Sequence, residues 1–214
     1  MHVPSTSLEQ IAAELRTDLE ATNHAREEAL RACREVIQFA SRSIRALHRG
    51  ELDQARTLAD ESKNRVDKVR MTLSEHPDLF HAGYVHDSQK EYVEAETMLA
   101  IVSETMLPSP AFLGVEIAAY LNGIAEAASE CRRYVLDRLR AGDIARAEAV
   151  LKVMDDIYFE LVTFDFPDAI TGGLRRTTDA LRAVLERTRG DLTLTMAQHR
   201  LEIALKSTGM ENRP

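Results

Sequence analysis

Apolar side chains recur at alternating steps of three and four residues from position 25 to position 49, and this spacing most constrains the fold. Such steps keep side chains on one face of an α-helix, whereas a strand alternates at every second residue. The stripe consists of Leu30, Cys33, Ile37, Ala40, Ile44 and Leu47. Because a long helix with one apolar face must pack against other elements, we expect an all-α bundle.

Glycine and proline divide the rest of the chain into further helical segments. The 214 residues include only 9 Gly, 6 Pro and no Trp, which suits long helices. We expect helices over about 7–48, 52–73, 84–106, 111–140, 143–164 and 170–206, with Asp143 capping the fifth and a break near Gly190 in the last. No Gly-, Pro- or Ser-rich linker separates two halves. Residues 1–214 are therefore predicted to form one single-domain bundle of about six to seven long helices.

Two glutamates of the third predicted helix lie inside its apolar arc rather than opposite it. Glu91 and Glu94 are separated by about one helical turn and fall among Tyr92, Ala95 and Met98. Burying an ionised carboxylate is costly unless it meets a cation, a metal or a proton. We therefore expect a specific partner for this pair, and a divalent metal ion is the first candidate.

A second pair of carboxylates occurs on the fourth predicted helix. Glu126 and Glu130 are four residues apart and share a face on the flank of the apolar arc, which taken alone is typical of a solvated helix edge. A turn at 108–110, bounded by prolines, would make the third and fourth helices antiparallel neighbours and would allow all four carboxylates to converge. Four carboxylates with no histidine at the site form an all-oxygen set, which suits Mg²⁺ or Mn²⁺ better than zinc.

A row of basic side chains runs beside the apolar stripe of the first helix. It consists of Arg31, Arg34, Arg42, Arg45 and Arg49. An arginine fork pairs two phosphate oxygens, so this arginine ridge could follow a nucleic-acid backbone although the net charge of the chain is −8. A solvated face, or a row that pairs with acidic residues of another helix, would produce the same spacing, and these alternatives stay open.

The remaining features indicate a cytoplasmic protein without a membrane segment. No apolar run approaches the roughly 20 residues that cross a bilayer, and the first ten residues lack the pattern of a signal peptide. Cys33 and Cys131 occupy apolar helical positions and are expected to be buried, reduced thiols. The loop residues His76, His81 and His86 are expected to be exposed polar groups.

Four segments, in order along the chain, resemble the translin superfamily and most closely its catalytic branch, typified by translin-associated factor X. Residues 41–49 end in Leu-His-Arg, as the family's first helix does, and residues 89–95 are similar to its Gln-Glu-Phe-Val-Glu-Ala signature. Residues 120–130 are similar to its Tyr-Leu-Leu-Gly-Val-Ala-Asp segment followed by Glu, and residues 141–143 to its Ala-Gly-Asp turn. A single polypeptide with both the ridge and the acidic set resembles the prokaryotic, chiefly archaeal, members built from one kind of subunit.

The resemblance implies both a site and an activity. Glu91, Glu94 and Glu126 would hold Mg²⁺ or Mn²⁺, and Glu130 would be a further ligand or a general base. Glu126 stands where the catalytic branch has Asp, so its side chain is one methylene longer and the metal geometry differs. The implied activity is metal-dependent endonuclease action on RNA, which the ridge would hold inside a homo-oligomeric barrel.

Assembly is also expected from the helices themselves, because they carry more apolar surface than one bundle of this size should bury. An octamer is the expected form. Two other functions remain open. One is a non-catalytic assembly that binds RNA or single-stranded DNA, in which the glutamates pair with arginines of a neighbouring subunit. The other is a helical scaffold for protein partners.

Overall fold

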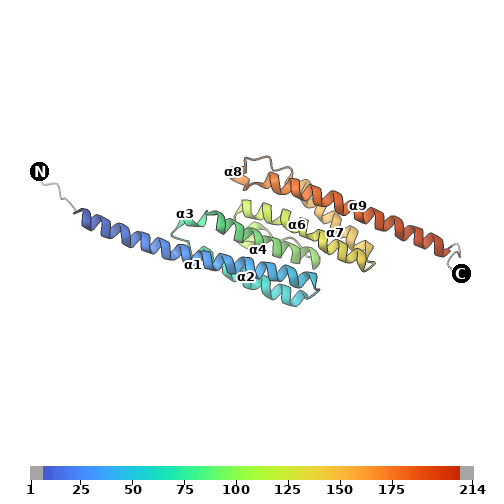
Figure 1. Cartoon of the computed structure of the whole chain (residues 1–214), viewed down its shortest axis with the longest axis horizontal. Helices are drawn as coiled ribbons and strands as arrows, with labels where there is room; N and C mark the ends of the chain where they lie inside the picture. The colour runs from blue at the N-terminus through green and yellow to red at the C-terminus, as the bar shows by residue number, and fades with distance from the viewer. Residues whose placement is uncertain (1–6, 208–214) are drawn as a thin grey trace.

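The computed structural model describes residues 7–207, which form a bundle of antiparallel helices (Figure 1). Six long helices are α1 (Leu8–His48), α2 (Leu52–Thr72), α4 (Gly83–Val102), α6 (Ile117–Arg140), α7 (Ile144–Leu161) and α9 (Leu174–Ser207). Single-turn helices α3 (Pro77–Phe80), α5 (Pro110–Leu113) and α8 (Asp168–Thr171) join them. No strand occurs within 7–207. The all-α fold predicted from the sequence is confirmed.

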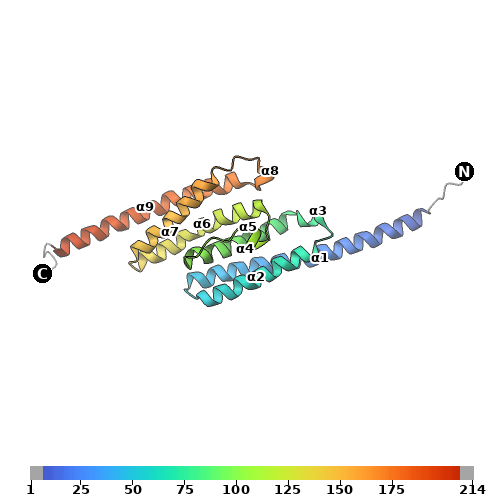
Figure 2. The ribbon, with the colours of Figure 1, turned by 180° about the vertical axis from the view of Figure 1, so that it is seen from behind.

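The two central helices are α4 and α6, which pack against each other along their length (Figures 1 and 2). Helix α1 covers the other side of α4 and pairs with α2, while α7 and α9 cover α6. The main core lies between α4, α6, α7 and α9 and includes Met98, Cys131 and Met154. A separate group with Val36 and Tyr92 lies between α1 and α4. The carboxylates of both pairs are therefore carried by the two most enclosed helices.

Helix α1 is defined by its ends and by small buried residues. Ser7 and Gln10 form a capping box at its start, and Gly50 follows its end in the left-handed region at φ 78°. The predicted stripe is slightly displaced, because Leu30 and Ile37 are only half-buried. The centre of the buried face instead runs along Ala29, Val36, Ala40, Ser43 and Leu47. Small side chains on this line let α1 approach α2 and α4 closely.

Two predicted helix boundaries near the prolines are wrong. Helix α4 ends at Val102 rather than near 106, because Glu104 adopts φ 58° and Thr105 N donates to Ala100 O at 3.0 Å. The predicted helix 111–140 is divided, because Gly114 (φ 68°) ends α5 and α6 begins only at Ile117. Left-handed residues, not the prolines alone, therefore terminate these helices.

The C-terminal half also departs from the predicted boundaries. Asp143 caps α7 as expected and accepts from Arg146 N at 3.2 Å, but the helix ends at Leu161 rather than 164. The predicted helix 170–206 is divided at Gly172 (φ 61°), where α8 ends. Gly190, in contrast, does not break α9, because a helical glycine surrounded by continuous helix costs only about 1 kcal/mol.

Both long terminal helices extend beyond the bundle, at opposite ends (Figures 1 and 2). The free part of α1, its N-terminal arm, exposes a stripe of leucines: Leu8, Leu15 and Leu19 are 79%, 56% and 68% exposed. The free end of α9, its C-terminal arm, exposes Leu201 (60%). These apolar side chains have little to pack against within one chain. None of the described helices is both long and apolar enough to cross a membrane.

Candidate metal centre and nucleic-acid interface

A glycine determines how close the two acidic helices come. A Cβ atom on Gly123 of α6 would lie 2.6 Å from Cβ of Val93 and 2.8 Å from the backbone oxygen of Lys90, both on α4. Any larger residue would force the helices apart. Because Glu126 follows Gly123 by one helical turn, this contact brings Glu126 beside the carboxylates of α4.

Three of the four predicted carboxylates lie together at this contact. Glu91, Glu94 and Glu126 each offer one oxygen, and these three oxygens lie within 4.8 Å of one another. All three side chains are half-buried, so each keeps some access to solvent. Lys90 donates from Nζ to Oε1 of Glu126 at 2.9 Å and brings one positive charge to the group.

Burial and mutual repulsion both favour protonation of this carboxylate cluster. Burial, with added repulsion from Glu91 and Glu126, raises the pKa of Glu94 to about 8. Burial likewise raises the pKa of Glu91, although Lys90 opposes the effect. Burial acts to lower the pKa of Lys90, but the hydrogen bond to Glu126 and the attraction of nearby carboxylates together outweigh burial, and the pKa is raised. Three carboxylates and one lysine leave net negative charge that a divalent cation would neutralise.

Glu130 lies outside the cluster of three and binds a histidine. Its Oε1 lies 2.6 Å from Nε2 of His48, at the end of α1, and only 1% of the His48 side chain is exposed. The expectation of a site without histidine is therefore wrong. His48 was visible in the Leu-His-Arg segment, but its partner is 82 residues away in sequence, so helical spacing could not reveal the pair. Lys90 was also missed, although it directly precedes Glu91.

The five residues of the arginine ridge are all exposed, but they differ in their partners. Arg49 is held by both carboxylate oxygens of Glu51, at 2.9 and 2.6 Å. Arg42 lies over the ring of Phe39, whose ring centroid is also 5.2 Å from the guanidinium of Arg65 on α2. The other three, Arg31, Arg34 and Arg45, form no ion pair with any described residue.

Helix register shows which of the free arginines share the face of α1 that carries His48. Arg45 precedes His48 by one turn, so the two share a face of α1, and Arg34 lies about three turns before Arg45 on the same side. His48 contacts Glu130, which places this edge of α1 beside the acidic helices. A nucleic-acid strand on Arg34 and Arg45 would therefore pass next to the carboxylates, whereas Arg42 faces α2.

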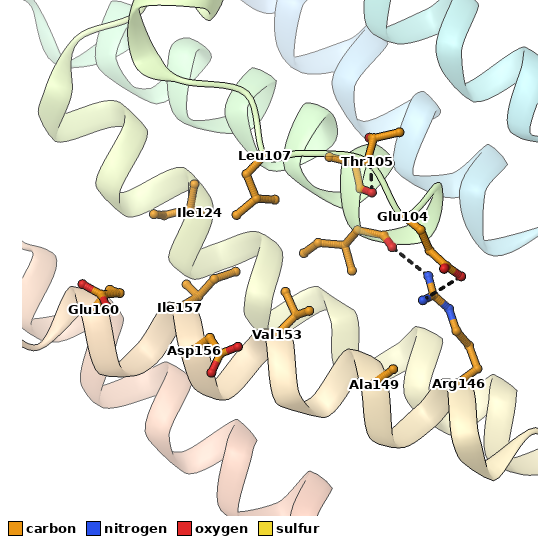
Figure 3. A pocket seen from close by; sticks show the side chains of 12 residues that line it. Glu104, Thr105, Leu107, Ile124, Arg146, Ala149, Val153, Asp156, Ile157 and Glu160 are labelled. Carbon is orange, nitrogen blue, oxygen red and sulfur yellow. Dashed lines mark hydrogen bonds and ion pairs between the residues drawn. The ribbon is translucent and has the colours of Figure 1, made fainter.

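An apolar cavity of about 520 Å³ lies elsewhere, between the end of α4, α6 and α7 (Figure 3). Apolar side chains such as Leu107, Val153 and Ile157 line it, and none of the four carboxylates does. Arg146 closes one end by donating from Nη2 to Ile101 O at 2.7 Å and pairing with Glu104 at 3.0 Å (Figure 3). The acidic residues of its lining, Glu104, Asp156 and Glu160, are not part of the carboxylate cluster, so the cavity is a separate surface.

The cysteine predictions are confirmed, and the histidine predictions only in part. Cys33 and Cys131 are buried and free, and burial raises the pKa of both thiols. His81 is exposed, with Glu116 at 3.2 Å. His76 and His86 are half-buried, so the expectation of exposed side chains is wrong for them. His86 packs under the α8 turn, where its Nε2 would lie 2.9 Å from a Cβ at Gly172.

Comparison with known proteins agrees with this architecture. No family model matches the chain. An uncharacterized protein of Methanocaldococcus jannaschii is 30% identical over 183 residues, which cover 85% of this chain and 81% of the relative. The solved structures of AfC3PO alone and of its complex with duplex RNA are each 34% identical, cover 87% of this chain and 97% of AfC3PO, and have TM-scores of 0.82 and 0.80.

A more distant structure shares the fold. Apo-NeC3PO, at 20% identity, covers 89% of this chain and 100% of its own, with a TM-score of 0.80. The chain thus shares its all-helical bundle with the solved C3PO structures over most of its length. The chain belongs to the translin superfamily.

Proposed function

We propose that this protein is a metal-dependent endoribonuclease that cleaves phosphodiester bonds of RNA. The observation that carries the proposal is the cluster of Glu91, Glu94 and Glu126, whose oxygens lie within 4.8 Å of one another with one lysine as counter-charge. The complex of the similar protein AfC3PO with duplex RNA supports RNA as the ligand.

The three carboxylates suit a hard divalent cation. They supply only oxygen atoms, and burial together with repulsion from Glu91 and Glu126 raises the pKa of Glu94, which a cation would counteract. When bound, Mg²⁺ or Mn²⁺ would supply a water molecule of lowered pKa and neutralise charge on the phosphate oxygens. Glu91, Glu94 and Glu126 would hold the ion, and Lys90 keeps the Glu126 carboxylate in place on the side facing α4.

Glu130 and the arginines complete the proposed mechanism. Glu130 lies on the same face of α6 as Glu126 and has one oxygen engaged by His48, so its other oxygen can accept a proton from the attacking water. Arg34 and Arg45 would bind phosphates of the strand through charge-assisted hydrogen bonds. Because these contacts go to the backbone, sequence preference should be weak.

Assembly into a homo-octamer is part of the proposal. The N-terminal arm exposes its leucine stripe, and the cavity between α4, α6 and α7 presents apolar surface on the bundle. Contacts between copies would cover both, and a closed ring of copies would enclose the RNA. The protein is expected to act in the cytoplasm.

The direct test is incubation of the purified protein with end-labelled single-stranded RNA in Mg²⁺, in Mn²⁺ and in EDTA. Internal cleavage products are expected with either ion and none with EDTA. Light scattering on the same sample measures the mass, and a monomer at micromolar concentration would contradict the octamer.

The alternative function is RNA or single-stranded DNA binding without catalysis. The hydrogen bond between Lys90 and Glu126 favours it, because a lysine already neutralises one of the carboxylates. In that case RNA binds in a salt-dependent manner but stays intact with every divalent ion. A helical scaffold for protein partners, in contrast, would show no salt-dependent RNA binding at all.

A further inference from the structure

A small polar pocket of about 280 Å³ lies where α1 turns into α2, against the second half of α6. The residues that give this corner pocket its chemistry are His48 and Arg49 of α1 and its cap, Leu52 at the start of α2, and Tyr134, Asp137 and Arg138 of α6. His48 also contacts Glu130, but only through Nε2, which leaves Nδ1 without a partner in the described chain.

The start of α2, where Leu52 lines this pocket, has free hydrogen-bond donors. Its N-cap residue, Glu51, makes no side-chain capping bond, so the first N–H groups of this 21-residue helix have no acceptor among the described residues. The last carbonyls of α1 do not fill the role, because Gly50 N and Glu51 N already bind Leu47 O and Ala46 O at 2.9 and 3.0 Å. An uncapped helix start attracts anions through these donors and the helix dipole.

A buried side chain independently indicates a ligand. The His48 side chain is 99% buried, lines the corner pocket and has no hydrogen-bond partner for Nδ1 within 7–207. Buried polar atoms are almost always hydrogen-bonded, so a missing partner needs an explanation. Nε of Arg138 is a second buried donor without an acceptor in the described chain. Two orphan nitrogens thus accompany the open end of α2.

The charges around the pocket favour an anion. Arg138 lies over the ring of Tyr134, 5.1 Å from its centroid, and no described carboxylate lies within ion-pair distance of it. Asp137 is the acidic side chain in the lining, and Arg140 offsets it at 3.3 Å. Arg49 is balanced by Glu51. One unbalanced arginine and the positive end of a helix remain.

We infer that the corner pocket binds a phosphoryl group. A tetrahedral phosphate offers several oxygens at once, to the N–H groups of α2, to Arg138 and to His48. Protonated phosphate oxygens and the neighbouring ribose hydroxyl can also donate, so Nδ1 finds a partner in either tautomer. Because the same imidazole binds Glu130, the inference rests on the proposed function in one respect: in RNA, this phosphate would lie next to the one that is cleaved.

Inorganic phosphate, titrated calorimetrically into the full-length protein without metal or RNA, tests the pocket itself. We expect Arg138→Gln to weaken phosphate binding by about tenfold or more, since a charge-assisted hydrogen bond is lost. Arg133→Gln is the matched control, because it removes the same charge from an exposed position of α6 that lies outside the pocket lining and pairs with no described carboxylate. Equal affinity of the Arg138→Gln and Arg133→Gln proteins, or no saturable binding to the parent, would overturn the inference.

Two substitutions of His48 separate its two nitrogens. The amide nitrogen of Gln takes the place of Nε2 and can still bind Glu130, whereas that of Asn takes the place of Nδ1. We expect His48→Gln to lose phosphate affinity and His48→Asn to retain most of it, with melting temperatures confirming that both fold. The reverse order would show that Nδ1 does not serve the ligand, for example because it binds only a water molecule.

Short RNAs then identify the source of the phosphoryl group. Binding is compared between strands ending in phosphate and in hydroxyl, with Ca²⁺ in place of Mg²⁺. A terminal-phosphate pocket predicts tighter binding of the phosphorylated strand, and this difference disappears in Arg138→Gln. A backbone-phosphate pocket predicts equal binding of both strands and a salt slope lower by about 0.7 in Arg138→Gln. If Arg138→Gln changes neither the effect of the terminal phosphate nor the salt slope, RNA does not use the pocket. Since none of these measurements needs cleavage, failure of the nuclease proposal would be seen separately.

Discussion

The two faces of α4 each carry a glutamate shielded from solvent, Glu96 fully and Glu94 in part, but their surroundings are opposite. Glu96 faces α2, is 8% exposed and has Nη1 of Arg56 at 3.6 Å. Burial raises its pKa, and Arg56 acts against that rise. Glu94 faces α6, where its nearest charged neighbours include Glu91, Glu126 and Glu130, and its pKa rises to about 8. Burial is common to both residues, and only the neighbours differ.

This comparison separates the carboxylates for which we propose a metal from those of a structural ion pair. Glu96 is a buried carboxylate beside an arginine, which is the arrangement of a structural ion pair. On the Glu94 face, several carboxylates share one lysine, so their negative charge is not balanced within the chain. The arginines follow the same division: those of α2 are paired, as Arg65 is with Glu35 and Glu61, whereas Arg34 and Arg45 on α1 are free.

The largest effect expected from this difference is on RNA cleavage. Glu94→Gln keeps the shape of the side chain but removes a metal-binding charge, so cleavage should fall by about a thousandfold or more while RNA binding persists. Glu96→Gln is the control and should cleave RNA at the parent rate. Cleavage rates under single-turnover conditions measure both. Equal losses in the two variants would remove the distinction between the faces.

The second effect concerns the free arginines. Reversing both Arg34 and Arg45 to Glu should weaken RNA binding by about 100-fold and lower the salt slope by roughly 0.7 per lost phosphate contact. The control is the same double reversal at Arg182 and Arg187, two exposed arginines of α9. Fluorescence anisotropy over a range of salt concentrations provides the measurement. Unchanged affinity would mean that the α1 ridge is a solvated or intersubunit surface.

A third test changes the separation of α4 and α6 without touching a charge. Gly123→Ala should destabilise the protein by about 2 kcal/mol, because its Cβ would overlap Val93, and should also weaken Mg²⁺ binding. Gly190→Ala is a matched control, since nothing lies within 4 Å of a Cβ there and α9 is continuous. That change should stabilise by about 1 kcal/mol. Urea unfolding with and without Mg²⁺ distinguishes the two variants. A Gly123→Ala protein with parental stability and Mg²⁺ affinity would show that the close approach of α4 and α6 at Gly123 does not determine the site.

The smallest effect expected is a pH dependence specific to the Glu94 face. The folded-state pKa of Glu94, about 8, exceeds its ordinary value of 4.5, so the folded chain holds a proton that the unfolded chain releases. Without metal, stability should therefore fall as pH rises from about 4.5 to about 8. Since Mg²⁺ must displace this proton, its affinity should rise by up to about tenfold per pH unit below pH 8. Melting curves with and without Mg²⁺ at several pH values test this, and both trends should be weaker in Glu94→Gln, where Glu91 is the remaining carboxylate of raised pKa.

The features predictable from sequence were those that depend on local spacing. Helix periodicity predicts every long helix, and the position of Glu91 and Glu94 inside an apolar arc predicts the place where three carboxylates meet. The cap at Asp143 was equally local, because it depends on three residues. These predictions share one property: the interacting groups are within a few turns of each other in the same helix.

The features that sequence could not show depend on contacts between helices or on single backbone torsions. Nothing in the spacing of α6 pairs Glu130 with His48, since that contact needs the relative placement of α1 and α6. The close approach at Gly123 is also a property of two helices. The end of α4 depends on the left-handed conformation of Glu104, which is unusual for a residue with a Cβ.

The exposed N-terminal arm also affects how the stability of this protein should be measured. Its leucines gain burial only if other copies cover them, as the octamer proposal requires, so part of the folding free energy would depend on protein concentration. The melting temperature would then rise with concentration by mass action. A chain diluted below the dissociation constant of the assembly would lose the arm's helical structure first, because an isolated helix of this length is marginal in water.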